Sequence, residues 1–189
     1  MNEPLETVSF TRMENGTREE YLFLSRHEEA AIQGVPARLM DALKMLDGSL
    51  EGYRVSRLEH SLQSATRAYE AGEDEEMIVA ALFHDIGDVL APASHSEMAA
   101  AILRPYVSDR VYWIIKHHGL FQSYYYAHHF DQDRNARDRH KDHQWYQDCV
   151  DFCANYDQNC FDPDYPSKPL EFFRPMVERV MAKPKEYTA

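Results

Sequence analysis

Apolar residues recur every three or four positions through most of this chain, and few segments alternate between apolar and polar positions. The first spacing is typical of a helix with one buried face, and the second of a half-buried strand. Turn residues interrupt the pattern: the Asp47-Gly48 pair ends one segment, and Pro36 suits the first turn of a helix. The sequence therefore predicts an all-α fold, with helices at about residues 19–31, 36–46, 56–71, 74–86, 95–103, 109–117, 144–155 and 170–181.

Three of these helices carry a side chain of the metal-ligand type on their apolar face. In helical register, His95 shares a face with Met98, Ala99 and Ile102, His118 with Val111, Ile114 and Ile115, and Asp157 with Val150, Cys153 and Ala154. Ser94 and Glu97 have the spacing of a capping box, which marks His95 as the start of its helix. We therefore expect all three side chains to point toward the core.

His84 and Asp85 directly follow the apolar run over residues 79–83. An unpaired carboxylate is costly to bury, whereas an imidazole and a carboxylate together can bind a metal ion. An isolated His-Asp pair can also be a polar helix end, so the pair alone leaves both interpretations open. His60 lies off the apolar stripe predicted for its helix, which is Leu58, Leu62, Ala65 and Tyr69. Its candidacy as a ligand therefore rests only on its spacing from the His84-Asp85 pair.

Size and charge restrict the class of protein. With 189 residues, 44% of them hydrophobic, we expect a single domain with an N-terminal helical extension (1–50), a metal-binding core (56–157) and a C-terminal segment (158–189). The net charge of -12 argues against a nucleic-acid partner. The absence of a membrane-length apolar run or a signal peptide predicts a cytoplasmic protein without a membrane partner. The three cysteines lack CxxC spacing and predict buried free thiols: Cys149, Cys153 and Cys160.

Residues 118–144 show no helical pattern, and a long irregular segment in a compact domain is commonly functional. We expect a lid or a pocket wall. The run Tyr124–Tyr126 could offer aromatic faces to a cation, and Arg134 and Arg137 could donate to an anion. The alternative is that the tyrosines are ordinary packing residues and most of the charged run is solvated surface.

Four residues have the order and spacing of a known motif: His60, His84, Asp85 and Asp157. They resemble the H…HD…D pattern of the HD-domain superfamily. The resemblance implies an all-α helical bundle. His95 and His118 raise the number of candidate ligands to six. Four ligands suit one metal ion, whereas six with a shared carboxylate suit two. In the two-ion arrangement Asp85 is the bridge, the first ion is held by His60, His84 and Asp157, and the second by His95 and His118.

Longer segments resemble the HD-domain mixed-valent diiron oxygenases of phosphonate breakdown, and these segments are Leu58–Gln63, His84–Gly87, Tyr156–Gln158 and Phe161–Tyr165. Together with Phe10–Met13 and Tyr124–Tyr126, these segments look most like the subset that acts on (1R)-1-hydroxy-2-(trimethylammonio)ethylphosphonate. The resemblance implies two iron ions, Fe(II) and Fe(III), with dioxygen as co-substrate and glycine betaine and phosphate as products. The segments at His118–Phe121 and Asn155–Asp157 are also similar to myo-inositol oxygenase.

Four positions depart from the related oxygenase that acts on 2-amino-1-hydroxyethylphosphonate. That relative contacts the phosphonate through a His and a Lys where this chain has Asp88 and Gln122, and it fills its vacant iron site with a Tyr and a Glu where this chain has Leu50 and Tyr53. We therefore expect Asp88, Gln122, Tyr124 and Tyr126 to contribute to a pocket for a trimethylammonio group. The expected partner is a small organophosphonate, and the oligomeric state is left open.

Two other functions are compatible with the same residues. An HD-type metal-dependent phosphohydrolase, such as a nucleotidase, would use a metal-bound hydroxide to attack phosphorus. A non-catalytic HD domain would bind a ligand as a sensor, for which six candidate ligands are more than is needed.

Overall fold

The computed structural model describes residues 6–185, and over this range the secondary structure is entirely helical. Its α-helices are α1 (Arg18–Gln33), α2 (Val35–Lys44), α3 (Arg57–Glu70), α4 (Glu75–Phe83), α5 (His95–Leu103), α6 (Asp109–Gln122), α7 (Tyr146–Phe152) and α8 (Leu170–Val180). Short 3-10 helices join several of them, and a π-helix, Cys153–Asp157, follows α7. The predicted all-α class in one domain is confirmed.

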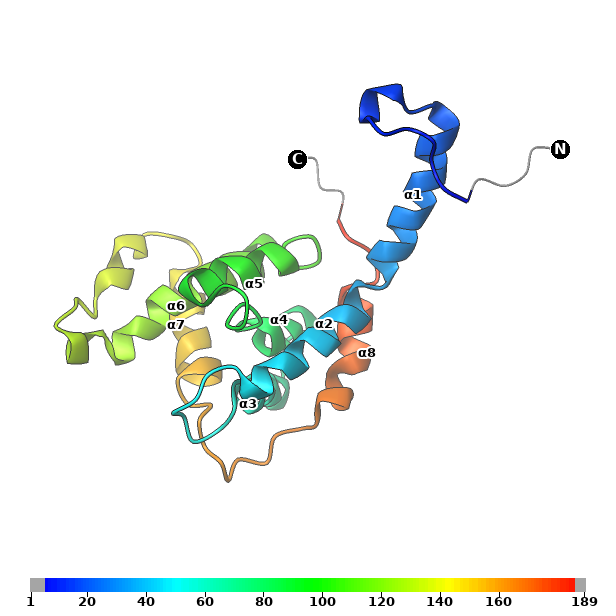
Figure 1. Ribbon diagram of the computed structural model, residues 1–189. Helices are drawn as coiled ribbons and strands as arrows, with labels where there is room; N and C mark the ends of the chain where they lie inside the picture. Colours follow the sequence, from blue (N-terminus) through cyan, green and yellow to red (C-terminus); the bar gives the residue numbers. More distant parts are fainter. Residues whose placement is uncertain (1–5, 186–189) are drawn as a thin grey trace.

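Helix α4 lies in the middle of the molecule (Figure 1), and α3, α6 and α8 contact it. Every side chain from Met77 to Phe83 is buried, which is expected of a helix that is apolar all round. The carboxylate of Asp74 caps its first turn by accepting from the Met77 amide. Because α4 ends at Phe83, the residues that follow it, His84 and Asp85, emerge inside the protein.

Helix α3 turns a polar face toward this core. The predicted stripe is only part of the buried face: Ala65 is buried, and Leu58 and Leu62 are half-buried against the core, but Tyr69 is exposed. The fully buried side chains are those of Arg57, His60, Ser61, Gln63, Ser64, Ala65, Thr66 and Ala68. Most of these side chains are small, so α3 can pack closely against α4 and carry His60 into the interior.

The start of α5 agrees with the prediction, but the capping box does not form. The side chain of Ser94 makes no cap hydrogen bond, because a 3-10 helix over Pro92–Ser94 runs directly into α5. Ser94 has a ψ angle of 32° instead of the extended conformation of a capping serine. His95 is therefore placed by the preceding turn.

Helix α6 continues five residues beyond its predicted end at His117, to Gln122. Gly119 lies inside it, where a Cβ atom would be 2.6 Å from the Ser96 hydroxyl oxygen, so this glycine lets α5 and α6 pack closely. The segment after α6 was expected to be irregular. It contains three short 3-10 helices, at Ser123–Tyr125, Ala127–Phe130 and Ala136–His140.

Helix α1 extends away from the rest of the molecule (Figure 1) and its sole buried side chain is Glu20. Within residues 6–185 no helix has the length and apolarity that a membrane span requires. The three cysteines are free and buried, as predicted.

Candidate metal centre

Separate elements bring the six predicted ligands to one place. His60 comes from α3, His84 and Asp85 from the end of α4, His95 from the first residue of α5, His118 from α6, and Asp157 from the last residue of the π-helix. Five of the residues are at most 3% exposed, and the side chain of His95 is 27% exposed. The structure thus clusters all six candidates, and their role as ligands remains a prediction.

Asp85 lies between two groups of histidines. Its Oδ2 atom is 3.2 Å from His60 Nε2 and 3.1 Å from His84 Nε2. Its Oδ1 atom is 3.4 Å from His95 Nε2 and 3.3 Å from His118 Nε2. Each oxygen of one carboxylate therefore serves a different pair of imidazoles. We call His60, His84 and Asp157 the inner set, and His95 and His118 the outer set.

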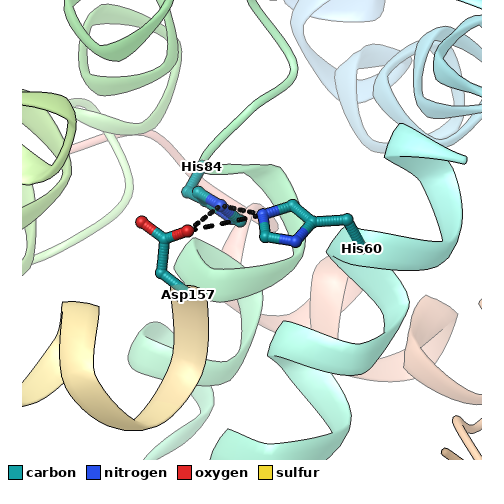
Figure 2. A group of neighbouring side chains, drawn as sticks. All are labelled: His60, His84 and Asp157. Atoms are coloured by element: carbon teal, nitrogen blue, oxygen red, sulfur yellow. Dashed lines mark hydrogen bonds and ion pairs between the residues drawn. The ribbon is translucent and has the colours of Figure 1, made fainter. Parts of the chain in front are cut away.

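Asp157 completes the inner set, as Figure 2 shows. Its Oδ1 atom is 3.5 Å from His60 Nε2 and 3.8 Å from His84 Nε2, and its Oδ2 atom is buried with no hydrogen-bond partner among the described residues. A buried carboxylate oxygen without a donor is costly. This oxygen is therefore available to a cation.

The histidine rings are oriented by the backbone. Each Nδ1 atom lies near a carbonyl oxygen, at 3.0 Å for His60 to Cys160, 2.7 Å for His84 to Ala81, 2.7 Å for His118 to Ile115 and 3.4 Å for His95 to Pro92. Because a carbonyl can only accept, Nδ1 of a neutral ring carries the proton and Nε2 presents its lone pair to the centre. If both rings are neutral, the Nε2 atoms of His60 and His84 face each other at 3.1 Å and their lone pairs repel, so the arrangement needs either a proton on one ring or a metal ion beside both. These residues fit a metal ion.

The charges at the centre also favour a cation. Burial opposes the charged form of His60, but hydrogen bonds with Asp157 and Asp85 outweigh it and raise the pKa of His60 to about 9. Burial likewise opposes the charge on Asp85, yet His84 and Arg57 hold the pKa of Asp85 well below its usual range. Despite burial, the pKa of Asp157 is lowered, mainly by its hydrogen bond with His60. The field that holds a proton on His60 would equally attract a metal ion.

Gly87 explains how His95 comes near Asp85. A Cβ atom at residue 87 would lie 2.7 Å from both the Cα atom and the carbonyl oxygen of His95. Since backbone atoms cannot move away as a flexible side chain can, residue 87 must be glycine for α5 to start here. The glycine of the His84–Gly87 motif thus has a packing reason.

The π-helix sets the position of Asp157. It follows α7 without a break, and it ends at Asp157. The thiol of Cys153 donates to the His118 carbonyl oxygen at 3.5 Å, which ties this turn to α6. An extra residue in one helical turn is frequent at functional sites. The apolar stripe predicted that Asp157 faces the core, but nothing in the sequence pattern indicated the π turn.

The centre opens on one side into a cavity of about 880 Å³, within the size range of small-molecule sites. Asp85, Asp157 and both residues of the outer set line it, whereas His60 and His84 are behind the wall. Among the predicted substrate contacts, the ones that line the cavity are Asp88, Gln122 and Tyr126. The segment after α6 therefore forms part of a pocket wall, as expected.

Three predicted contacts are not on this wall. Tyr124 lies between two arginines, and the guanidinium carbons of Arg134 and Arg137 are 4.1 Å and 3.8 Å from the centroid of its ring. These side chains stack on one another and do not line the cavity, so the structure gives their predicted contact with a ligand no support, and that contact stays a prediction.

Sequence reasoning missed Arg57 and Phe161 as cavity residues, and it gave Tyr53 no contact with a substrate. The rings of Tyr53 and Phe161 stack at 5.0 Å, and Phe161 also stacks on His60 at 4.4 Å. Arg57 could have been found, because it precedes His60 by three residues and so shares its helix face. The stacking of Phe161 had no signal in the sequence, since it follows from a loop conformation.

Comparison with known families agrees with this geometry. A search of curated proteins gives no match to the chain. The model of one family, the HD domain, matches residues 57–147, a range that includes Asp85 and all four histidines of the centre. Asp157 lies just beyond the match. The HD domain and the His/Asp cluster are together consistent with a metal-dependent HD enzyme. The chain thus contains an HD domain, at residues 57–147.

Proposed function

We propose that this protein is a diiron oxygenase that cleaves the C–P bond of a 1-hydroxyphosphonate. The observation that carries the proposal is the position of Asp85, which offers one oxygen to the inner set and the other to the outer set. A shared carboxylate between two groups of imidazoles is suited to two metal ions. A single ion would leave one of the two groups without a role.

The choice of iron rests on chemistry and on the resemblance of the motifs. Imidazole and carboxylate ligands suit iron but also manganese, nickel and zinc. The buried thiols point elsewhere, since the Sγ atoms of Cys149 and Cys153 contact the carbonyl oxygens of Ile114 and His118. An Fe(II)/Fe(III) pair held by the two sets would supply the binding of dioxygen and the redox chemistry.

The chain's own residues determine where the substrate meets this centre. The histidines of the inner set lie behind the cavity wall, whereas Asp85, Asp157 and the outer set line the cavity. A ligand can therefore approach on the side of Asp85 Oδ1 and His95. The balanced reaction converts the C1 alcohol to a carboxylate and releases phosphorus as phosphate, and the two oxygen atoms of O2 account for the additional oxygen in the products.

The cavity wall favours the trimethylammonio compound as substrate. A quaternary ammonium group donates no hydrogen bond and is bound by aromatic faces. Aromatic side chains from three segments line the cavity, namely Tyr53, Tyr125, Tyr126, Phe130 and Phe161. The proposed contact with Tyr126 is therefore kept, and Tyr53 and Phe161 take the place expected of Tyr124.

The test combines oxygen uptake with product analysis. The iron-loaded protein should consume one O2 for each phosphate released from (1R)-1-hydroxy-2-(trimethylammonio)ethylphosphonate and should form glycine betaine. Electron paramagnetic resonance should show a coupled Fe(II)/Fe(III) pair. Phosphate release from nucleotides under anaerobic conditions, without oxygen uptake on the phosphonate, would replace this proposal with a metal-dependent phosphohydrolase.

A further inference from the structure

Arg57 is the one lysine or arginine among the described residues that line the cavity. The other charged groups on the wall are the carboxylates of Asp85, Asp88 and Asp157. An anion that enters the cavity therefore meets a single cationic side chain. The proposed substrate carries such an anion, its phosphonate group.

The guanidinium group of Arg57 is firmly held on one edge. Its Nε atom donates to Asp88 Oδ2 at 2.8 Å, and its Nη2 atom donates to Asp85 Oδ2. The side chain is 10% exposed, and its Cζ atom is 5.4 Å and 5.9 Å from the ring centroids of Tyr53 and Phe161. These contacts fix the plane of the group before any ligand binds.

The other edge remains available. No hydrogen bond from Arg57 Nη1 to another described residue is formed, so its two N–H groups are free to donate. Free donors on a preorganised guanidinium suit a phosphate or phosphonate oxygen, because the planar fork matches the geometry of an oxyanion. A lysine would provide a point charge but no fork.

Among the described residues on the wall, no second lysine or arginine is present to take this part. Asp88 and Gln122 stand where the related phosphonate oxygenase has its His and Lys, and neither is a cation. The arginines predicted from the sequence, Arg134 and Arg137, stack on Tyr124 and do not line the cavity. Arg57 is therefore the residue on this wall that can give a phosphonate a charge-assisted hydrogen bond.

We infer that Arg57 forms an oxyanion subsite beside Asp85 and binds the phosphonate end of the substrate, while the aromatic wall around Tyr126 receives the ammonium end. The identity of the ligand rests on the proposed function, but the subsite itself rests on Arg57 and the cavity. The pair of Asp85 and Asp88 orients the guanidinium, which places the phosphonate next to the metal centre.

The experiment measures binding by calorimetry to the metal-loaded, full-length protein under anaerobic conditions. The ligands are the hydroxyphosphonate, inorganic phosphate, and choline, which has the ammonium group without an anion. Arg57→Gln should weaken both anions about tenfold or more, and Arg57→Lys should weaken them less, because it restores the charge without the fork. Choline should bind each variant as it binds the wild type. Arg54→Gln is the matched control, since Arg54 is exposed and three residues earlier.

Metal content and thermal unfolding of each variant are measured alongside. The subsite is disproved if both Arg57 variants hold metal and bind phosphate as tightly as the wild type does. It is also disproved if the variants lose affinity for choline to the same extent as for phosphate. If Arg57→Gln does not hold metal, the test rests on Arg57→Lys. The subsite then requires that this variant bind phosphate severalfold more weakly than the wild type. A wild type that binds phosphate through Arg57 but neither binds nor oxidises the hydroxyphosphonate would refute the proposed function and leave the subsite intact.

Discussion

The inner and outer sets use the same kinds of side chain but differ in access. The histidines of the inner set are buried between α3, α4 and the π-helix, and of this set Asp157 alone reaches the cavity wall. The outer set lies on the cavity wall, and its His95 is the most exposed of the six candidate ligands. One carboxylate, Asp85, connects the two. A closed set can hold an ion but cannot receive a substrate, whereas an open set can do both.

The difference follows from how each ligand is carried. His60 and His84 project from helices that pack against each other, so protein atoms surround their rings. His95 is the first residue of α5 and is placed by the backbone contact with Gly87. A ligand at the start of a helix next to a turn can remain partly open to a cavity. The predictions below test whether the two sets behave as separate sites with one shared residue.

The largest effect is expected from Asp85→Ala, because Asp85 serves both sets. Metal content after reconstitution should fall from about two ions to nearly none, since both sets lose a shared ligand. Elemental analysis measures it. Asp164→Ala is the control, as Asp164 is an exposed aspartate away from the centre. Retention of one full ion in Asp85→Ala would show that the two sets do not depend on a common bridge.

The second comparison is between His84→Ala and His95→Ala. Each should lose about one ion, but from different sets. An ion present at a hundred times its dissociation constant stabilises the fold by about 2.7 kcal/mol. In a chain of this length that amounts to a melting temperature roughly 5–10 °C higher.

We expect His84→Ala to lose most of that stabilisation, because the inner ion would join α3, α4 and the π-helix. His95→Ala should lose less, since the outer set offers fewer protein ligands. Thermal unfolding of the metal-loaded variants measures the difference. Equal shifts, or a larger shift for His95→Ala, would contradict the distinction between a closed and an open set.

A third prediction targets the position of the outer set alone. Gly87→Ala places a Cβ atom 2.7 Å from the backbone of His95, so the start of α5 must shift. Metal content should fall toward one ion, while the inner set keeps its own. Gly48→Ala is the matched control, because nothing lies within 4 Å of a Cβ atom at residue 48. Full occupancy of both sets in Gly87→Ala would disprove the packing role of this glycine.

Apolar periodicity was sufficient to predict the helices and the direction of three of the six candidate ligands, His95, His118 and Asp157. The faces of α6 and the central position of α4 could be predicted because apolar side chains dominate them. The face of α3 could not, because small and polar residues are buried there and no apolar stripe marks them. His60 was predicted from the motif and not from its helix, so the superfamily pattern supplied what periodicity lacked.

The cavity wall was the least predictable part. Tyr53 and Phe161 reach it from two loops that are far apart in the sequence, and their stacking depends on long-range packing. The run Tyr124–Tyr126 shows the limit of a local argument. Tyr125 and Tyr126 line the cavity, whereas Tyr124 stacks with two arginines, because successive residues of a 3-10 helix point in different directions.

A fourth prediction concerns protons released when the inner set binds metal. Hydrogen bonds with Asp157 and Asp85 raise the pKa of His60 to about 9 against the opposing effect of burial, so the ring holds a proton at neutral pH when no ion is bound. A metal ion displaces this proton. The affinity of the inner set should therefore rise about tenfold per pH unit as the pH approaches 9, and level off above it.

Calorimetry of zinc binding, in buffers with different heats of ionisation, measures the number of protons released. His95→Ala isolates the inner set in this titration. Proton uptake, or an affinity that does not change between pH 7 and pH 8.5, would contradict the prediction.

The smallest effect is expected on the open side, at the aromatic wall. Tyr126 lines the cavity and its neighbour Tyr124 does not, which makes the two a matched pair. A cation–π contact contributes roughly 0.5–2 kcal/mol, so Tyr126→Leu should lower kcat/KM for the trimethylammonio substrate by about two- to thirtyfold. The efficiency with 2-amino-1-hydroxyethylphosphonate should change less, because a primary amine can also use hydrogen bonds. Tyr124→Leu should leave the ratio of the two efficiencies unchanged, since that ring packs against arginines. A change of the ratio in Tyr124→Leu but not in Tyr126→Leu would show that the ammonium group is bound away from this cavity wall.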